Sequence, residues 1–94
     1  MGPKEFVAAR ELTCVLARET LGYLSEAEYA DSTRAVLDGF DQAESDVIYA
    51  KAIGYYDGLM FGIPAGAERQ VMLRLQAYVS SQACTANVSL GQEI

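Results

Sequence analysis

The sequence VIYAKAIGYYDGLMFGI, residues 47–63, contains only two charged side chains, Lys51 and Asp57. At 100° per residue, its apolar side chains fall on both sides of the helix that this stretch predicts. A helix that is apolar on two sides is normally buried at the centre of a fold. We therefore expect the rest of the chain to be organised around this helix, with little of its surface in contact with water.

Three glycines at a spacing of four residues, Gly54, Gly58 and Gly62, cut a notch along one side of this helix, and Phe61 lies on the same side. Each Gly inside a helix costs about 1 kcal/mol of stability relative to Ala. Close packing would offset that cost, so we expect Gly54, Gly58 and Phe61 to form a packing face. The sequence leaves open whether another helix of the same chain packs there or a partner, including a second copy.

Stop and capping signals define the first two helices. Gly22 ends a helix that covers about residues 4–21, and Ser25 with Glu28 forms a capping box that opens a second helix at about residue 26. Gly39 marks the expected end of the second helix. The apolar residues with helical spacing are Ala8, Leu12, Val15 and Leu16 in the first helix and Tyr29, Val36, Leu37 and Phe40 in the second.

The next two helices have less sharply defined ends. Asp41 with Glu44 predicts an N-terminus of the central helix at residue 42, and Ser45 is the competing N-cap. We expect this helix to end near Gly62. Pro64 fits the first position of a fourth helix that runs to about residue 83.

The short turns between these segments favour helices that run roughly antiparallel to their neighbours. The predicted fold is all-α, a compact single domain of about four helices in residues 1–83, arranged as helical hairpins. Residues 84–94 are small and polar and show no periodicity, so we expect an irregular or disordered tail.

The chain is acidic, with 13 acidic residues against seven basic ones. The imbalance lies in residues 19–57, where nine acidic residues face only Arg34 and Lys51, a local net charge of −7. A surface of this sign repels phosphate backbones, which disfavours direct nucleic-acid binding and favours a partner with a basic surface.

Several classes of chemistry lack their usual residues. The chain has no His, and neither a Walker nor a dinucleotide glycine loop is present. The carboxylates of Asp38, Asp41 and Glu44 lie at a predicted helix junction, where capping explains them. We therefore expect a protein that is not an enzyme and holds no cofactor or metal. The apolar run 47–63 is too short and carries too much charge to favour a membrane span.

Cys14 and Cys84 lie far apart in the sequence and match no metal-ligand or CxxC spacing. No secretory signal pattern precedes them. We expect both to be reduced thiols in a cytoplasmic protein, with a disulfide that ties the tail to the first helix as the alternative.

One short segment resembles a known family. Residues 45–50, SDVIYA, are similar to the SDLIYY segment of the immunity proteins of nuclease colicins, which are small, acidic, four-helix inhibitors of DNases. This resemblance implies that Asp46 and Tyr49 belong to a nuclease-binding face. Ala50 stands where that family has a second tyrosine, and the proline after it is missing. By size, charge and the lack of a catalytic set, the chain also resembles the small acidic inhibitors that phages encode against bacterial defence systems, anti-CRISPR proteins among them.

The expected function is that of a small acidic inhibitor that binds a nucleic-acid-handling protein through the acidic middle of the chain. The alternative is a homodimeric structural or scaffolding module that associates through the Gly54 and Gly58 face. Aromatic side chains beside acidic ones are typical of protein-binding surfaces. The candidate partner-binding residues are Asp38, Asp41, Glu44, Asp46, Tyr49 and Asp57.

Overall fold

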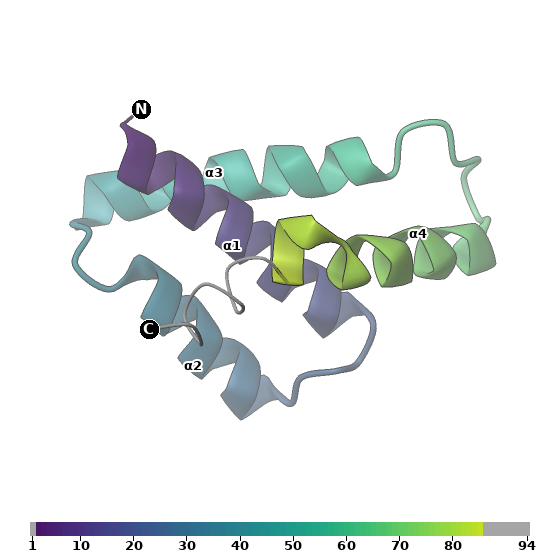
Figure 1. The fold of residues 1–94 in the computed structure, drawn as a ribbon, viewed down its shortest axis with the longest axis horizontal. Coiled ribbons are helices and arrows are strands. Elements are labelled where there is room, and N and C mark those ends of the chain that lie inside the picture. Colours follow the sequence, from purple (N-terminus) through teal and green to yellow (C-terminus); the bar gives the residue numbers. More distant parts are fainter. Residues whose placement is uncertain (1, 86–94) are drawn as a thin grey trace.

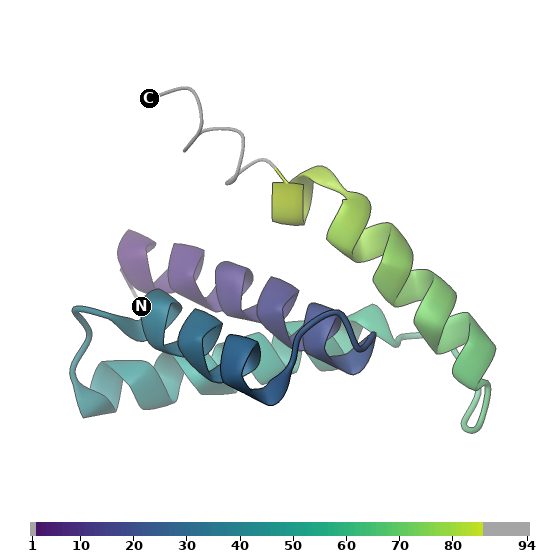
Figure 2. The ribbon, with the colours of Figure 1, turned by 90° about the horizontal axis from the view of Figure 1, so that it is seen from below.

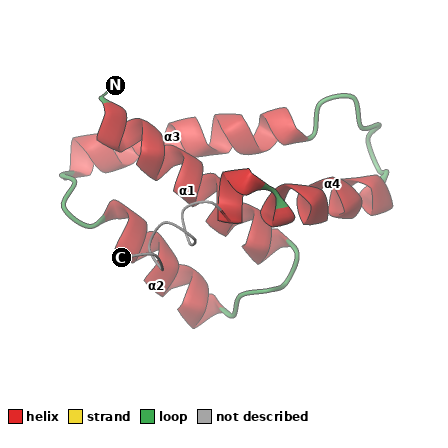
Figure 3. Ribbon diagram, in the orientation of Figure 1, coloured by secondary structure: helices red, strands yellow, loops and turns green. Residues whose placement is uncertain are grey.

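The computed structural model describes residues 2–85, and in this part of the chain it contains four α-helices and no strand (Figure 3). The predicted all-α fold is confirmed. A further helical turn covers residues 82–85. Consecutive helices run in roughly opposite directions (Figure 1). The helices are α1 (Pro3–Thr20), α2 (Glu26–Leu37), α3 (Gln42–Leu59) and α4 (Glu68–Ser80).

The helix at the centre of the fold is α1, which packs against each of the other three helices (Figures 1 and 2). Its fully buried residues include Leu12, and α3 contributes only Ile48 and Ala52 to the buried core. The prediction that residues 47–63 form the central helix, hardly touched by water, is therefore wrong. The core residues are Ala8, Ala9, Leu12, Val15, Ile48 and Ala52, flanked by Leu16, Leu24, Tyr29, Val36, Leu37 and Phe40.

Small residues on α1 allow α3 to approach closely. Ala8 and Ala9 are buried against α3. Thr13 is buried beside them, and its hydroxyl donates to the carbonyl of Ala9 at 2.8 Å and lies 3.4 Å from the carbonyl of Ala52 on α3. A buried hydroxyl without such partners would be destabilising. The first helix thus places both its apolar face and its one buried polar side chain at the centre of the domain.

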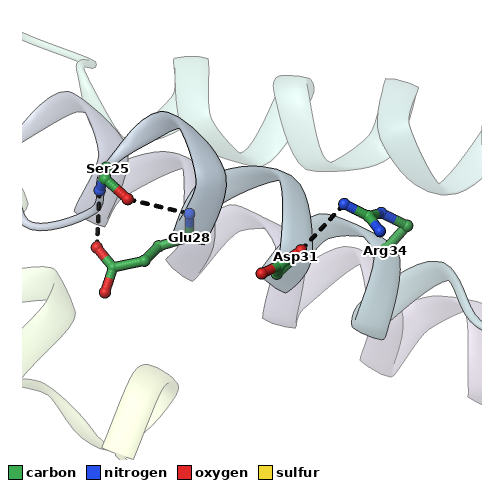
Figure 4. Close-up of polar contacts among 4 residues, drawn as sticks. All are labelled: Ser25, Glu28, Asp31 and Arg34. Carbon is green, nitrogen blue, oxygen red and sulfur yellow. Dashed lines mark hydrogen bonds and ion pairs between the residues drawn. The ribbon is translucent and has the colours of Figure 1, made fainter.

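Both predicted capping boxes are confirmed. The hydroxyl of Ser25 accepts from the N–H of Glu28 at 3.1 Å, and the N–H of Ser25 donates to the Glu28 carboxylate at 2.8 Å (Figure 4). This backbone bond lowers the pKa of Glu28. Asp41 and Glu44 make the equivalent pair of bonds, so α3 starts at Gln42 and Ser45 is not its N-cap.

The connection between α3 and α4 is longer than predicted. Helix α3 ends at Leu59, and α4 begins at Glu68 rather than at Pro64. Gly62 and Gly66 both have positive φ, 83° and 85°, and this conformation interrupts a right-handed helix. Arg74 of α4 closes the connection by donating to the carbonyls of Leu59 at 2.7 Å and Phe61 at 3.2 Å.

Cys14 and Cys84 form a disulfide, so the prediction of reduced thiols is wrong. The fold brings the end of α4 back over α1, which places the two Cα atoms 5.7 Å apart despite 70 residues of sequence separation. Arg18 reinforces the junction by donating to the carbonyl of Cys84 at 3.4 Å. The expectation of a cytoplasmic location rested partly on reduced thiols and loses that support. Of the predicted tail, residues 84 and 85 are helical, and the rest lies outside the described residues.

Candidate protein-binding surface

Most of the candidate residues gather at the junction between α2 and α3. Asp38 follows the last residue of α2, Asp41 is the N-cap of α3, and Glu44 and Asp46 lie in the first turns of α3, followed by Tyr49. Asp57 lies eleven residues beyond Asp46, which places it about 16 Å further along the helix. The structure therefore brings five of the six candidates together and separates Asp57 from them.

The carboxylates at this junction bond to their own helix rather than to cations. Asp41 and Glu44 cap α3, and the Asp46 carboxylate accepts from the side-chain amide of Gln42 at 2.8 Å. Within residues 2–85 the single ion pair joins Arg34 to Asp31 at 3.0 Å on exposed α2 (Figure 4). The local charge of −7 is thus left almost entirely without internal neutralisation.

Beside the junction lies a hollow of about 610 Å³, which we call the α2–α3 hollow. Two candidate residues, Asp38 and Tyr49, share it. The pKa of Tyr29 is raised to about 12, mainly by a hydrogen bond with Tyr49 and to a smaller degree by partial burial. The two helices therefore meet here through tyrosines. The hollow is lined by Tyr29, Ala30, Thr33, Arg34, Leu37, Asp38, Gly39, Phe40 and Tyr49.

The helical spacing of Tyr29 and Phe40 predicted two core residues and no binding role for them. Both are only partly buried against the core, and the rest of each side chain lines the hollow. Tyr29 lies on the predicted inward face of α2, whereas Phe40 lies in the turn after that helix. The missing signal was the pairing of that face with Tyr49 across the short turn between α2 and α3.

The glycine notch of α3 is open. A Cβ atom added at Gly54 or Gly58 would meet no atom within 4 Å, so of the two alternatives left open, no helix of the same chain packs closely on the notch. The reason is the placement of α4, which packs on α1 and is inclined away from the layer of the other three helices (Figure 2). Phe61 lies in the connection after α3, 86% exposed.

The notch forms one wall of a second depression, the glycine groove, of about 370 Å³ between α1, α3 and α4. The aromatic side chains that line it contact one another. The ring centroids of Phe6 and Tyr55 lie 6.3 Å apart in an edge-to-face arrangement, and the Arg10 guanidinium lies 5.8 Å from the centroid of the Phe6 ring. Burial raises the pKa of Tyr78. The groove is lined by Phe6, Arg10, Gly54, Tyr55, Gly58, Leu59 and Tyr78.

Comparisons with protein-family models, curated proteins and solved structures found no match to this chain. The site must therefore be interpreted from its own geometry. In the described part of the chain, no three His, Cys, Asp or Glu side chains group closely enough to hold a metal ion. None of the described helices has the length and apolar character needed to cross a membrane.

Proposed function

We propose that the chain is a non-enzymatic protein-binding domain that docks on a basic surface of its partner through the junction of α2 and α3. The observation that carries this proposal is the concentration of carboxylates without cationic partners around an aromatic hollow. Unlike charges speed association, and aromatic side chains supply much of the energy of protein interfaces.

Basic surfaces are common on proteins that handle nucleic acids, because these surfaces neutralise phosphates. A domain with a local net charge of −7 that occupies such a surface excludes the nucleic acid from it. We therefore propose that the protein acts as an inhibitor of a nuclease or another nucleic-acid-binding protein. This is the role that the resemblance to immunity and anti-CRISPR proteins implies.

The test compares two double charge reversals that avoid the capping boxes of α2 and α3. Asp38→Lys with Asp46→Lys changes the junction, and Glu11→Lys with Glu68→Lys makes the same change in charge elsewhere. The immobilised proteins are used to capture nucleic-acid-binding proteins from an extract, and each captured protein is then assayed for DNA or RNA binding in the presence of the free domain. We expect the junction variant to bind and inhibit roughly tenfold less well, a difference of about 1.4 kcal/mol, and the control variant to match the wild type.

Circular dichroism of both variants separates lost binding from lost fold. Salt supplies an independent check, since raising its concentration shortens the Debye length from about 10 Å at 0.1 M to about 3 Å at 1 M and should weaken the complex. Equal binding by both folded variants would exclude the junction as the docking surface. Capture without inhibition would leave a binding domain that is not an inhibitor.

A second candidate function, self-association through the glycine face of α3, is favoured by a separate observation. The sites of Gly54 and Gly58 are open, and Val47 and Ile53 on the same helix are 45% and 42% exposed. Gly58→Leu should keep the fold, because the added side chain enters open space, and should block close approach of a second copy. Light scattering over a range of concentrations decides: a dimer that the variant dissociates supports self-association, and a monomer throughout excludes it.

A further inference from the structure

The α2–α3 hollow combines two kinds of group that recognise the same chemical partner. It has aromatic walls from Tyr29, Phe40 and Tyr49 and an exposed carboxylate from Asp38. Each of these groups can interact favourably with a cation. Their presence in one depression distinguishes it from the glycine groove, which has no carboxylate and already contains the guanidinium of Arg10.

The electrostatics of the hollow favour positive charge. Helix α2 ends at Leu37, so the negative end of its dipole lies at the hollow, and Asp38 follows directly. The capping carboxylates of Asp41 and Glu44 lie on the adjoining turn. The one cation in the lining, Arg34, is engaged by the Asp31 carboxylate at 3.0 Å (Figure 4). No other cationic side chain lines the hollow.

The walls of the hollow offer aromatic faces to a cation. Cations are attracted to such faces, most strongly where water is excluded. Tyr29 and Phe40 are partly buried against the core, so their rings are held in place where they line the hollow.

We propose that the α2–α3 hollow receives an arginine side chain of the partner protein. The guanidinium stacks on the aromatic walls and donates to the Asp38 carboxylate. Arginine fits better than lysine, because a planar guanidinium stacks on rings and offers five donors, whereas an ammonium is a compact, strongly hydrated charge. The volume of about 610 Å³ also leaves room for the residues on either side of the arginine.

This inference rests on the proposed function, since it names the part of the basic partner that the junction recognises. It can be tested without the partner. The ¹⁵N-labelled protein is titrated with three capped tripeptides, Gly-Arg-Gly, Gly-Lys-Gly and Gly-citrulline-Gly, and amide shifts are followed by NMR. Citrulline keeps the shape of arginine and removes its charge.

We expect saturable shifts around Thr33, Asp38 and Tyr49 with the arginine peptide, weaker shifts with the lysine peptide and none with the citrulline peptide. Asp38→Asn should weaken arginine binding by roughly twofold to fivefold, the range of one exposed ion pair. Glu68→Gln is the control, because it removes one negative charge from an exposed position of α4 that does not line the hollow, and it should leave binding unchanged.

Two outcomes would overturn the inference. Shifts of equal size with the arginine and lysine peptides, spread along the acidic surface, would show general charge attraction without a specific binding site for the guanidinium. Absence of shifts at the hollow would exclude it as a binding site. Either result would leave the proposed function intact if the charge reversals at Asp38 and Asp46 still weaken partner binding. If those reversals had no effect while the arginine peptide still bound, the proposed function would be removed and the arginine site would remain.

Discussion

Helices α1 and α3 have the same length, 18 residues, and opposite relations to the core. Helix α1 carries six charged residues and buries seven residues, whereas α3 is the more apolar helix and buries only Ile48 and Ala52. The comparison shows that apolar content alone does not decide burial. What decides it is how many neighbouring helices a segment can contact.

The difference follows from what packs around each helix. The buried residues of α1, from Ala8 to Ala17, lie on several sides of the helix, because α2, α3 and α4 all pack against it. The apolar residues of α3 also surround their helix, but only one side can meet α1. The other side would need a covering helix, but α4 packs on α1 instead. An exposed apolar side with aromatic and acidic neighbours is typical of a binding surface.

The largest difference in stability is expected when one buried side chain of α1 and one exposed side chain of α3 are truncated. Leu12→Ala in α1 removes a side chain with no exposed surface and should lower the free energy of unfolding by about 2–5 kcal/mol. Ile53→Ala in α3, where the side chain is 42% exposed, should lower it by less than about 0.5 kcal/mol. Urea unfolding followed by circular dichroism measures both. Similar losses for the two variants would mean that α3 is covered in solution, for example by a second copy.

The second test concerns the disulfide, which links α1 to the segment after α4 and leaves α3 without a covalent tie. Its loss should lower stability by about 2–4 kcal/mol, because the cross-link restricts a long loop of the unfolded chain. In Cys14→Ser with Cys84→Ser, amides of α4 should lose protection from hydrogen exchange more than amides of α3, since α4 has one fully buried residue, Leu75. The wild type should respond to reductant in the same way, and the double variant should be insensitive to it. Equal loss of protection in α3 and α4 would contradict this.

The sequence predicted the helices better than it predicted their packing. Capping boxes act within four residues, so Ser25 with Glu28 and Asp41 with Glu44 correctly placed two helix starts. The start of α4 was wrong because Pro64 also fits a turn, and the positive φ of Gly66 delays the helix until Glu68. Helix starts can be predicted from such local signals because the interactions that decide them lie close together in the sequence.

Predictions that depended on contacts between distant segments were less successful. The burial of α3, the packing of the Gly54 and Gly58 notch, and the state of Cys14 and Cys84 all depend on where α4 lies, and periodicity within one helix does not determine that position. The junction acids Asp38 and Asp46 came out beside Tyr49 because a short turn joins α2 to α3. The hollow that Asp38 and Tyr49 share is also lined by Tyr29 of α2 and by Phe40 of the turn between α2 and α3, which the sequence indicated only as core residues.

A smaller effect, of opposite sign, is expected at the glycines of α3. Gly58→Ala should stabilise the protein by about 0.5–1 kcal/mol, because Ala is the better helix former and its Cβ would meet no atom within 4 Å. Gly22→Ala provides the contrast, since the φ of 80° at Gly22 should make that substitution destabilising. Thermal unfolding measures both changes. A destabilising Gly58→Ala would indicate that another backbone approaches this face.

The smallest expected change in stability concerns Tyr49 and Tyr29, the pair of polar side chains through which α3 meets α2. The hydrogen bond with Tyr49 raises the pKa of Tyr29 from its ordinary value of 10.0 to about 12. A raised pKa means that the folded protein holds the phenol proton more tightly than the unfolded chain does. The resulting stabilisation is therefore present in full below pH 10 and is lost as the pH rises from about 10 to about 12.

Urea unfolding at pH 9 and pH 11 measures this loss, and its size should be modest because Tyr29 is only partly buried. Tyr49→Phe removes the hydrogen bond and should flatten the decline, whereas Tyr23→Phe, which removes an exposed phenol that is 54% accessible, should preserve it. If the Tyr49 and Tyr23 variants declined equally, α3 would have no specific polar contact with α2. Its position would then depend on its packing against α1.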